Sequence, residues 1–175
     1  MGLILVRIYD SYDTAAKRAE TAAQVLKDTE MTDSFTGNEA TAIRVNYGNI
    51  LGNGDNNDAL VTVSFGPENN IMAVYRKNGD SYEYAGTVGY FYGVDNISIE
   101  KLADRPDVII FRERNNQSIG AREKSGFIRG YMYQNGKFEN VLNIDENIES
   151  WFSSTDNGKT SWEKVEQTCV INPSE

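Results

Sequence analysis

Histidine is absent from this sequence of 175 residues, and cysteine occurs once, as Cys169. Without histidine the chain cannot form a Ser-His-Asp triad or a Cys-His dyad, and a zinc site built from nitrogen and sulfur ligands is excluded as well. A lone cysteine also excludes an intrachain disulfide. Its apolar neighbours Val170 and Ile171 favour a strand that packs the thiol as a small hydrophobic side chain.

Long hydrophobic runs are missing too. The apolar run at residues 2–6 is far shorter than the about 20 residues that span a bilayer, and shorter than the about 7–15 of the apolar part of a signal peptide. It is either the start of a native strand or helix, or the trimmed end of a longer signal anchor. We therefore expect contact with a membrane only through an anchor that this chain does not contain.

Basic residues are scarce, with 17 Lys and Arg against 26 Asp and Glu, a net charge of -9 and a pI near 4.6. This acidic balance repels phosphates, so we expect no nucleic-acid partner. Hydrophobic residues make up 39% of the chain and aromatic residues 11%, which is enough for one core at this length. We expect a single soluble domain over residues 1–175.

One segment, residues 9–28, has a convincing helical pattern. Apolar or small side chains recur three or four residues apart, which places them on one face of a helix. Asp10 or Ser11 is the expected N-cap. Because the stripe is rich in alanine, we expect this N-terminal helix to approach a sheet closely; its members are Ile8, Tyr12, Ala15, Ala19, Ala22 and Leu26.

Beyond residue 40 the sequence turns to β-branched and aromatic residues separated by Gly, Asn and Asp. No helical segment lies between the predicted strands to act as a crossover, which indicates antiparallel meanders. We predict a mainly β fold, a twisted sheet or small sandwich, with residues 40–145 as two units and 146–175 as a C-terminal hairpin or strand. The predicted strands are 42–47, 59–65, 71–77, 82–88, 97–102, 108–114, 127–133, 138–143 and 162–171, with 148–152 ambiguous.

An internal repeat relates these units. Residues 55–58 and 104–107 both have the pattern D-x-x-D and both lead directly into a predicted strand. Each is followed by a predicted hairpin whose turn contains Asn-Gly, at 78–79 and 135–136, and a fainter copy occurs at 157–158. Asn-Gly suits a type I′ turn, because both central residues need positive φ. Two related strand groups are therefore expected.

The first unit resembles a known family. Residues 52–63, GNGDNNDALVTV, with the following strand and the Asn78-Gly79 hairpin, are similar to the FG-GAP/VCBS type of β-propeller blade. The resemblance implies blade-like units, an acidic loop that often binds calcium, and an exported or cell-surface setting. The chain has room for roughly three such units, whereas closed propellers have four or more blades, so we expect open sheets.

The acidic loop has two interpretations. Asn53, Asp55 and Asp58 would be the ligands of a weak calcium site, completed by backbone carbonyls and water. Alternatively, the same side chains bond their own backbone in an Asx-type turn. Two carboxylates favour the turn, because calcium prefers six to eight oxygen ligands, several of them charged. No other cofactor is expected.

The densest polar segment, residues 111–124, gathers basic residues on an acidic chain. It predicts a binding loop for a carboxylate, a phosphate or an acidic protein surface. The alternative, which we favour, is a solvated hairpin whose Arg and Glu side chains pair across strands, each pair contributing at most about 1 kcal/mol. The candidate binding residues are Arg112, Arg114, Gln117, Arg122 and Glu123.

Aromatic residues offer a second contact surface. Tyr82 and Tyr92 would stack on a sugar or meet a protein if their rings face water. Phe91 and Trp162 are instead expected in the core.

The leading functional hypothesis is a non-catalytic binding or accessory module, the extracytoplasmic part of a membrane-anchored protein or lipoprotein, with a protein, anionic or carbohydrate ligand. One alternative is a hydrolase that acts on cell-wall or polysaccharide material through paired carboxylates. Another is an intracellular acidic protein that binds or inhibits a basic partner.

Overall fold

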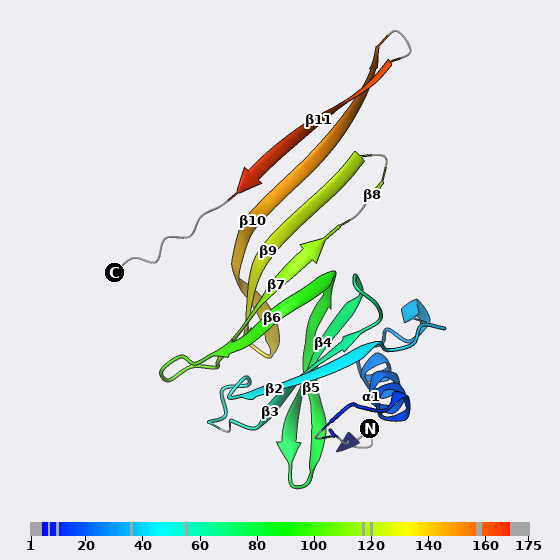
Figure 1. Ribbon diagram of the computed structural model, residues 1–175. Coiled ribbons are helices and arrows are strands. Elements are labelled where there is room, and N and C mark those ends of the chain that lie inside the picture. The colour runs from blue at the N-terminus through cyan, green and yellow to red at the C-terminus, as the bar shows by residue number, and fades with distance from the viewer. Residues whose placement is uncertain are drawn as a thin grey trace.

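The computed structural model describes residues 5–6, 8–9, 11–35, 37–54, 56–116, 118–119, 121–156 and 159–168. In this part of the chain the fold is mainly β with one α-helix (Figure 1). The elements are β1 (Leu5–Val6), α1 (Ala15–Asp28), the 3-10 turn η1 (Asp33–Phe35), β2 (Ala42–Gly48), β3 (Asp58–Ser64), β4 (Asn70–Asn78), β5 (Ser81–Phe91), β6 (Gly93–Glu100), β7 (Val108–Asn115), β8 (Ser118–Ile119), β9 (Ala121–Gln134), β10 (Lys137–Asp156) and β11 (Lys159–Thr168). Within the described residues no helix has the length and apolar character to cross a membrane.

The strands form two open antiparallel sheets. Sheet A has the order β1-β5-β4-β3-β2 and sheet B the order β11-β10-β9-β7-β6, with β8 paired to β9. Each sheet contains a meander of four strands, β2–β5 in sheet A and β6, β7, β9 and β10 in sheet B. The predicted mainly β fold is therefore confirmed, and the second strand of each meander follows one of the two D-x-x-D segments.

Three layers pack on one another. One core cluster lies between α1 and the outer face of sheet A, and it includes Val25, Leu26, Val61 and Ile71. A second cluster joins the inner face of sheet A to sheet B, for example Leu60 to the side chains of Ile109 and Phe111. Every residue of β3 is buried because both faces of this strand are covered.

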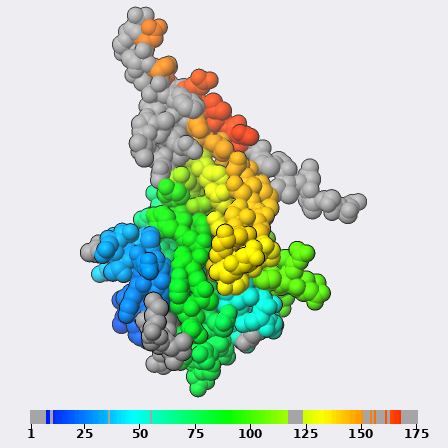
Figure 2. Space-filling model, turned by 180° about the vertical axis from the view of Figure 1, so that it is seen from behind, coloured from blue at the N-terminus to red at the C-terminus, as the bar shows by residue number. Residues whose placement is uncertain are grey.

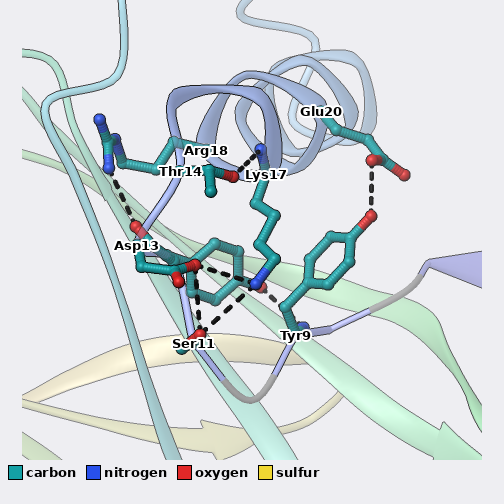
Figure 3. A network of polar contacts seen from close by, with 8 residues as sticks. Tyr9, Ser11, Asp13, Thr14, Lys17, Arg18 and Glu20 are labelled. Carbon is teal, nitrogen blue, oxygen red and sulfur yellow. Dashed lines mark hydrogen bonds and ion pairs between the residues drawn. The ribbon is translucent and has the colours of Figure 1, made fainter.

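The helix begins later than its pattern predicts. Residue 9 was the expected start, yet α1 starts at Ala15, because Thr14 has extended φ and ψ and its Oγ1 accepts a bond of 3.3 Å from the Lys17 amide. The expected caps, Asp10 and Ser11, are wrong. The preceding segment instead lies against the helix, where Asp13 pairs with Lys17 at 2.9 Å and the Tyr9 hydroxyl donates to Glu20 at 2.6 Å (Figure 3).

Strand lengths depart from prediction where polar residues continue a sheet. Predicted strand 138–143 is part of β10, which has 20 residues and also contains the ambiguous segment 148–152. In Figure 1, β9, β10 and β11 rise as a long ribbon away from α1. Polar residues line much of this ribbon, so hydrophobic alternation ends long before the strand does.

The two hairpin turns are of different types. Asn135 and Gly136 have φ of +52° and +82°, the two positive values that a type I′ turn requires, as predicted. In the first hairpin the turn residues are Gly79 and Asp80, and of these two Gly79 alone has positive φ, +60°. That pattern is typical of a type II′ turn, so the predicted Asn78-Gly79 position is one residue too early. Residues 157–158 lie outside the described part of the chain.

Candidate functional site

Two of the predicted binding residues meet at one hollow in sheet B. Arg112 and Arg114 stand on β7, which confirms the predicted strand 108–114, so neither lies in a loop. With Lys124 of β9 and Glu146 of β10 they line a hollow of about 450 Å³, which we call the first hollow. Asn116 and Asn147 complete its polar rim.

Strand alternation places both arginines on the same face. On β7 the side chains of Ile109, Phe111 and Glu113 are buried, while those between them are half-buried or exposed. Space for the hollow comes from Gly126, which pairs with Arg114 in the register of β7 and β9. A Cβ added at Gly126 would collide with the Asn147 amide oxygen.

Each arginine is paired with a carboxylate on another strand of sheet B: Arg112 with Glu146 of β10, two strands away, and Arg114 with Asp95 of the adjacent β6. Arg114 Nε lies 3.1 Å from Asp95 Oδ2. The Arg114 side chain remains 54% exposed, so its pair with Asp95 contributes at most about 1 kcal/mol. Both carboxylates lie outside residues 111–124, so these pairs are not the pairs within one hairpin that the solvated-hairpin interpretation predicts. They hold the two guanidinium groups in place beside the hollow.

The charge of the first hollow opposes that of the chain. Three cations, Arg112, Arg114 and Lys124, stand against one carboxylate, Glu146. The whole protein carries a net charge of -9. An anionic group would therefore find at this hollow the attraction that much of the surface does not offer.

A second hollow of about 520 Å³ adjoins the first and shares Arg114 and Asn116 with it. It lies where the edge strands of the two sheets meet, with Arg44 of β2 and Asp95 of β6 in its lining. Arg44 Nη1 donates to the Val94 carbonyl at 3.3 Å and links the two edges. Arg114 therefore stands between two hollows.

Glu113 is a structural residue of this region. It is 6% exposed; its Oε1 accepts from the Tyr92 amide at 3.1 Å, and its Oε2 accepts from Arg129 Nε at 2.9 Å. The bond to Tyr92 ties β7 to the connection between the sheets. Both carboxylate oxygens of Glu113 are therefore used in contacts that stabilise the fold.

The remaining predicted binding residues lie largely outside the description. Gln117 is among the residues that the structure does not describe, and for Arg122 and Glu123 only the backbone in β9 is described. Lys124 lies in the predicted binding segment 111–124 without being among its candidate residues, and Glu146 and Asn147 lie outside that segment. Nothing in the sequence singles out the two β10 residues, because their proximity to β7 depends on the full length of β10.

The predicted calcium ligands, too, are only partly among the described residues. Asp58 is 1% exposed, and its Oδ2 accepts from the Leu51 amide at 2.9 Å; Asp55 lies outside the described residues. Among the described residues, no three acidic, histidine or cysteine side chains gather as a metal site would require. The contact of Asp58 fits a carboxylate that closes its own loop, and calcium binding by Asn53, Asp55 and Asp58 stays a prediction.

Asp107, the counterpart of Asp58, bonds the same connection from sheet B. Its Oδ2 accepts from the Asn49 amide at 2.8 Å, and its own amide donates to the Asn49 carbonyl at 3.0 Å. The last Asp of each D-x-x-D segment thus accepts a hydrogen bond from the β2–β3 connection. Asp58 does so from within sheet A, and Asp107 does so across the boundary between the two sheets.

The aromatic residues follow the core prediction in part. Phe91 is 5% exposed in the second core cluster, as expected. Tyr82 and Tyr84 pack half-buried against the first cluster, whereas Tyr90 is exposed. Partial burial, with Tyr92 and Glu68 nearby, raises the pKa of Tyr90. The side chains of Trp151 and Trp162 lie outside the described part of the structure.

Comparison with protein-family models, with curated proteins and with solved structures finds no match to this chain. Its function is therefore inferred from the site geometry and the sequence.

Proposed function

We propose that this chain is a non-catalytic binding module that holds an acidic segment of a partner protein at the first hollow. The observation that carries the proposal is the convergence of Arg112, Arg114 and Lys124, from two paired strands, on a chain of net charge -9. A guanidinium group presents a planar fork of donors that matches a carboxylate, which makes arginine well suited to this ligand class.

The present ion pairs prepare the site for such a ligand. Glu146 and Asp95 hold Arg112 and Arg114 without enclosing them, since the arginine side chains remain 33% and 54% exposed. A ligand carboxylate can bind the free donors of each guanidinium without breaking the existing pair. Little side-chain conformational freedom is then lost on binding.

The hydrolase hypothesis fits the two hollows less well. A glycosidase needs two carboxyl groups facing each other across the substrate. The described lining of the first hollow supplies Glu146 and that of the second supplies Asp95, each paired with an arginine. An anion, by contrast, can bind to the two arginines while both ion pairs stay in place.

The same proposal includes the type of repeat unit and the cellular location of the chain. We take the two meanders as propeller-blade-like units and the chain as the extracytoplasmic part of a membrane-anchored protein or lipoprotein. Support comes from the repeated four-strand order, the paired D-x-x-D loops and the FG-GAP/VCBS resemblance of the first unit.

Fluorescence anisotropy with a labelled oligoglutamate peptide tests the site. We expect binding at low salt that weakens toward about 0.15 M ionic strength. The double variant Arg112→Gln/Arg114→Gln should weaken it about tenfold or more, which corresponds to ~1.4 kcal/mol. The matched control is Arg105→Gln, an exposed arginine outside both hollows. Equal loss in the control, or no loss in the double variant, contradicts the proposal.

A further inference from the structure

The internal repeat allows the outer faces of the two sheets to be compared position by position. When Asp58 is matched with Asp107, Val61 and Val63 of β3 correspond to Ile110 and Arg112 of β7. The registers extend the match to the next strand, where Ile71 corresponds to Ile128. Two of these three positions therefore carry apolar side chains in both sheets, and at the third Arg112 stands in place of Val63.

In sheet A this face is covered by a helix. Val61, Val63 and Ile71 are at most 1% exposed, and they pack in one cluster with Val25 and Leu26 of α1. The exposed residues of α1 are four alanines together with Glu20 and Lys27. In sheet A the outer face of the repeat unit is thus buried by a helix that packs on the sheet.

In sheet B none of the described residues forms such a cover over the same face. We call it the open face, and its apolar residues are half-buried and belong to neither core cluster. Among the described residues α1 is the one α-helix, and it packs on sheet A. Figure 2 shows this blue segment and the yellow part of β10 on opposite sides of the green strands. The open face consists of Ile110, Ile128, Met132, Leu142 and Ile144.

The open face continues directly into the first hollow. Ile110 pairs with Gly130, Arg112 with Ile128, and Arg114 with Gly126 along the register of β7 and β9. One end of this surface is therefore apolar, and the other is cationic. The complementary occupant has an apolar stripe and carboxylates toward one end.

We propose that the partner segment of the binding module is an amphipathic α-helix that lies on the open face, with acidic residues at the end that meets Arg112, Arg114 and Lys124. This inference rests on the proposed function, which it makes more specific. Sheet A shows the arrangement in the same molecule, since α1 covers the equivalent face with aliphatic and small side chains.

The dimensions agree with one helix. From Met132 to Lys124 the face spans eight residues of β9, about 26 Å at ~3.3 Å per residue. A helix of roughly 17 residues covers that distance at 1.5 Å per residue. By the same rise, α1 with its 14 residues is about 21 Å long.

Selection from a phage-displayed library of random peptides of about 20 residues, with the full chain as bait, tests the inference. The enriched sequences should place apolar residues at i, i+3, i+4 and i+7 and should cluster Asp or Glu toward one end. Affinity of the enriched peptides for the double variant Ile128→Thr/Ile144→Thr should fall about tenfold or more. Threonine keeps the β-branched shape while it removes apolar surface.

The matched control is Val141→Thr, also on β10 but 44% exposed and outside the open face, which should bind as the parent chain does. Circular dichroism checks the fold, and the single variant Ile144→Thr replaces the double variant if that one melts early.

The outcomes separate the two proposals. Enriched peptides that depend on Arg112 and Arg114 but lack the helical spacing, or that bind the Ile128→Thr/Ile144→Thr variant unchanged, overturn the helix while the anion site stands. Peptides that ignore the arginines as well overturn both. A dimer in sedimentation that the isoleucine substitutions dissociate assigns the open face to a second copy and overturns the helix.

Discussion

The two sheets share a four-strand order but differ in what covers their outer faces. Sheet A lies between α1 and sheet B, and every residue of its strand β3 is buried. Strand β7 of sheet B alternates, with buried Ile109, Phe111 and Glu113 on the inner side. Where the covered sheet has Val63, the open one has Arg112. A face without a helix over it tolerates a cation, and that cation becomes available to a ligand.

The sharpest way to test this comparison uses one residue type at equivalent positions. Ile71→Ala in sheet A should lower the free energy of unfolding by about 2–5 kcal/mol, because Ile71 is 1% exposed and a cavity remains under α1. Ile128→Ala in sheet B should lower it by about 1 kcal/mol or less, because its side chain is already half in water. Urea unfolding of both variants measures the difference, and equal losses would show that sheet B is covered after all.

The boundary between the sheets gives the next largest effect. Asp107→Ala should destabilise the protein by about 1–3 kcal/mol, since the half-buried Asn49 amide loses its acceptor. Asp58→Ala should act similarly but within sheet A. Hydrogen exchange distinguishes them: Asp107→Ala should loosen β6 and β7 first, and Asp58→Ala the β2–β3 connection. Identical exchange patterns would refute the separate roles.

The helix-covered sheet should also respond to alkaline pH. Tyr75 is fully buried beneath α1, and burial, reinforced by Asp28 at 3.0 Å from its hydroxyl, raises the pKa of this phenol. The phenol of the unfolded chain titrates near 10. The contribution of Tyr75 to the free energy of unfolding is therefore fully present below about pH 10, and above that pH it falls by up to ~1.4 kcal/mol per pH unit. Unfolding midpoints across this range should show a shallower decline in Tyr75→Phe, and parallel slopes would contradict the assignment.

The smallest expected effect concerns the start of the helical cover. The hydrogen bond and ion pair with Lys17 lower the pKa of Asp13 below 3.8. A lowered pKa contributes stability above that value, and the contribution is lost as the pH falls through the folded-state pKa. The pair is exposed, so the change is slight. In an NMR titration Lys17→Gln should raise the pKa of the Asp13 carboxyl, and an unmoved titration would show that the pair does not form in solution.

Much of the fold was predictable from local pattern. Hydrophobic alternation located nearly all of the β-strands, and the D-x-x-D repeat anticipated that the second strand of each meander follows an acidic loop. The helix start was not predictable from periodicity, because Ile8 and Tyr12 continue the apolar spacing although the backbone turns helical only after Thr14. The geometry of the Thr14 N-cap, rather than the apolar spacing, sets the first residue of the helix.

The candidate site was predictable only in part. The concentration of arginine in residues 111–124 pointed to Arg112 and Arg114, yet their partners Asp95 and Glu146 lie on other strands. Those pairs depend on strand register and on two irregularities in the pairing of β10 with β9. Register of this kind follows from tertiary packing, which no short motif in the sequence specifies.

The two bonds between Asp107 and Asn49 have a mechanical consequence. Donor and acceptor are used in both directions at this contact, so the β2–β3 connection and the start of β7 move as one body. Nearby, a Cβ on Gly48 would lie 2.9 Å from the Asp107 carboxylate, so glycine is needed for this close approach. Together with the Arg44–Val94 bond beside the second hollow, this contact joins the two sheets near both ends of β2, so separating the sheets along this strand requires both contacts to break.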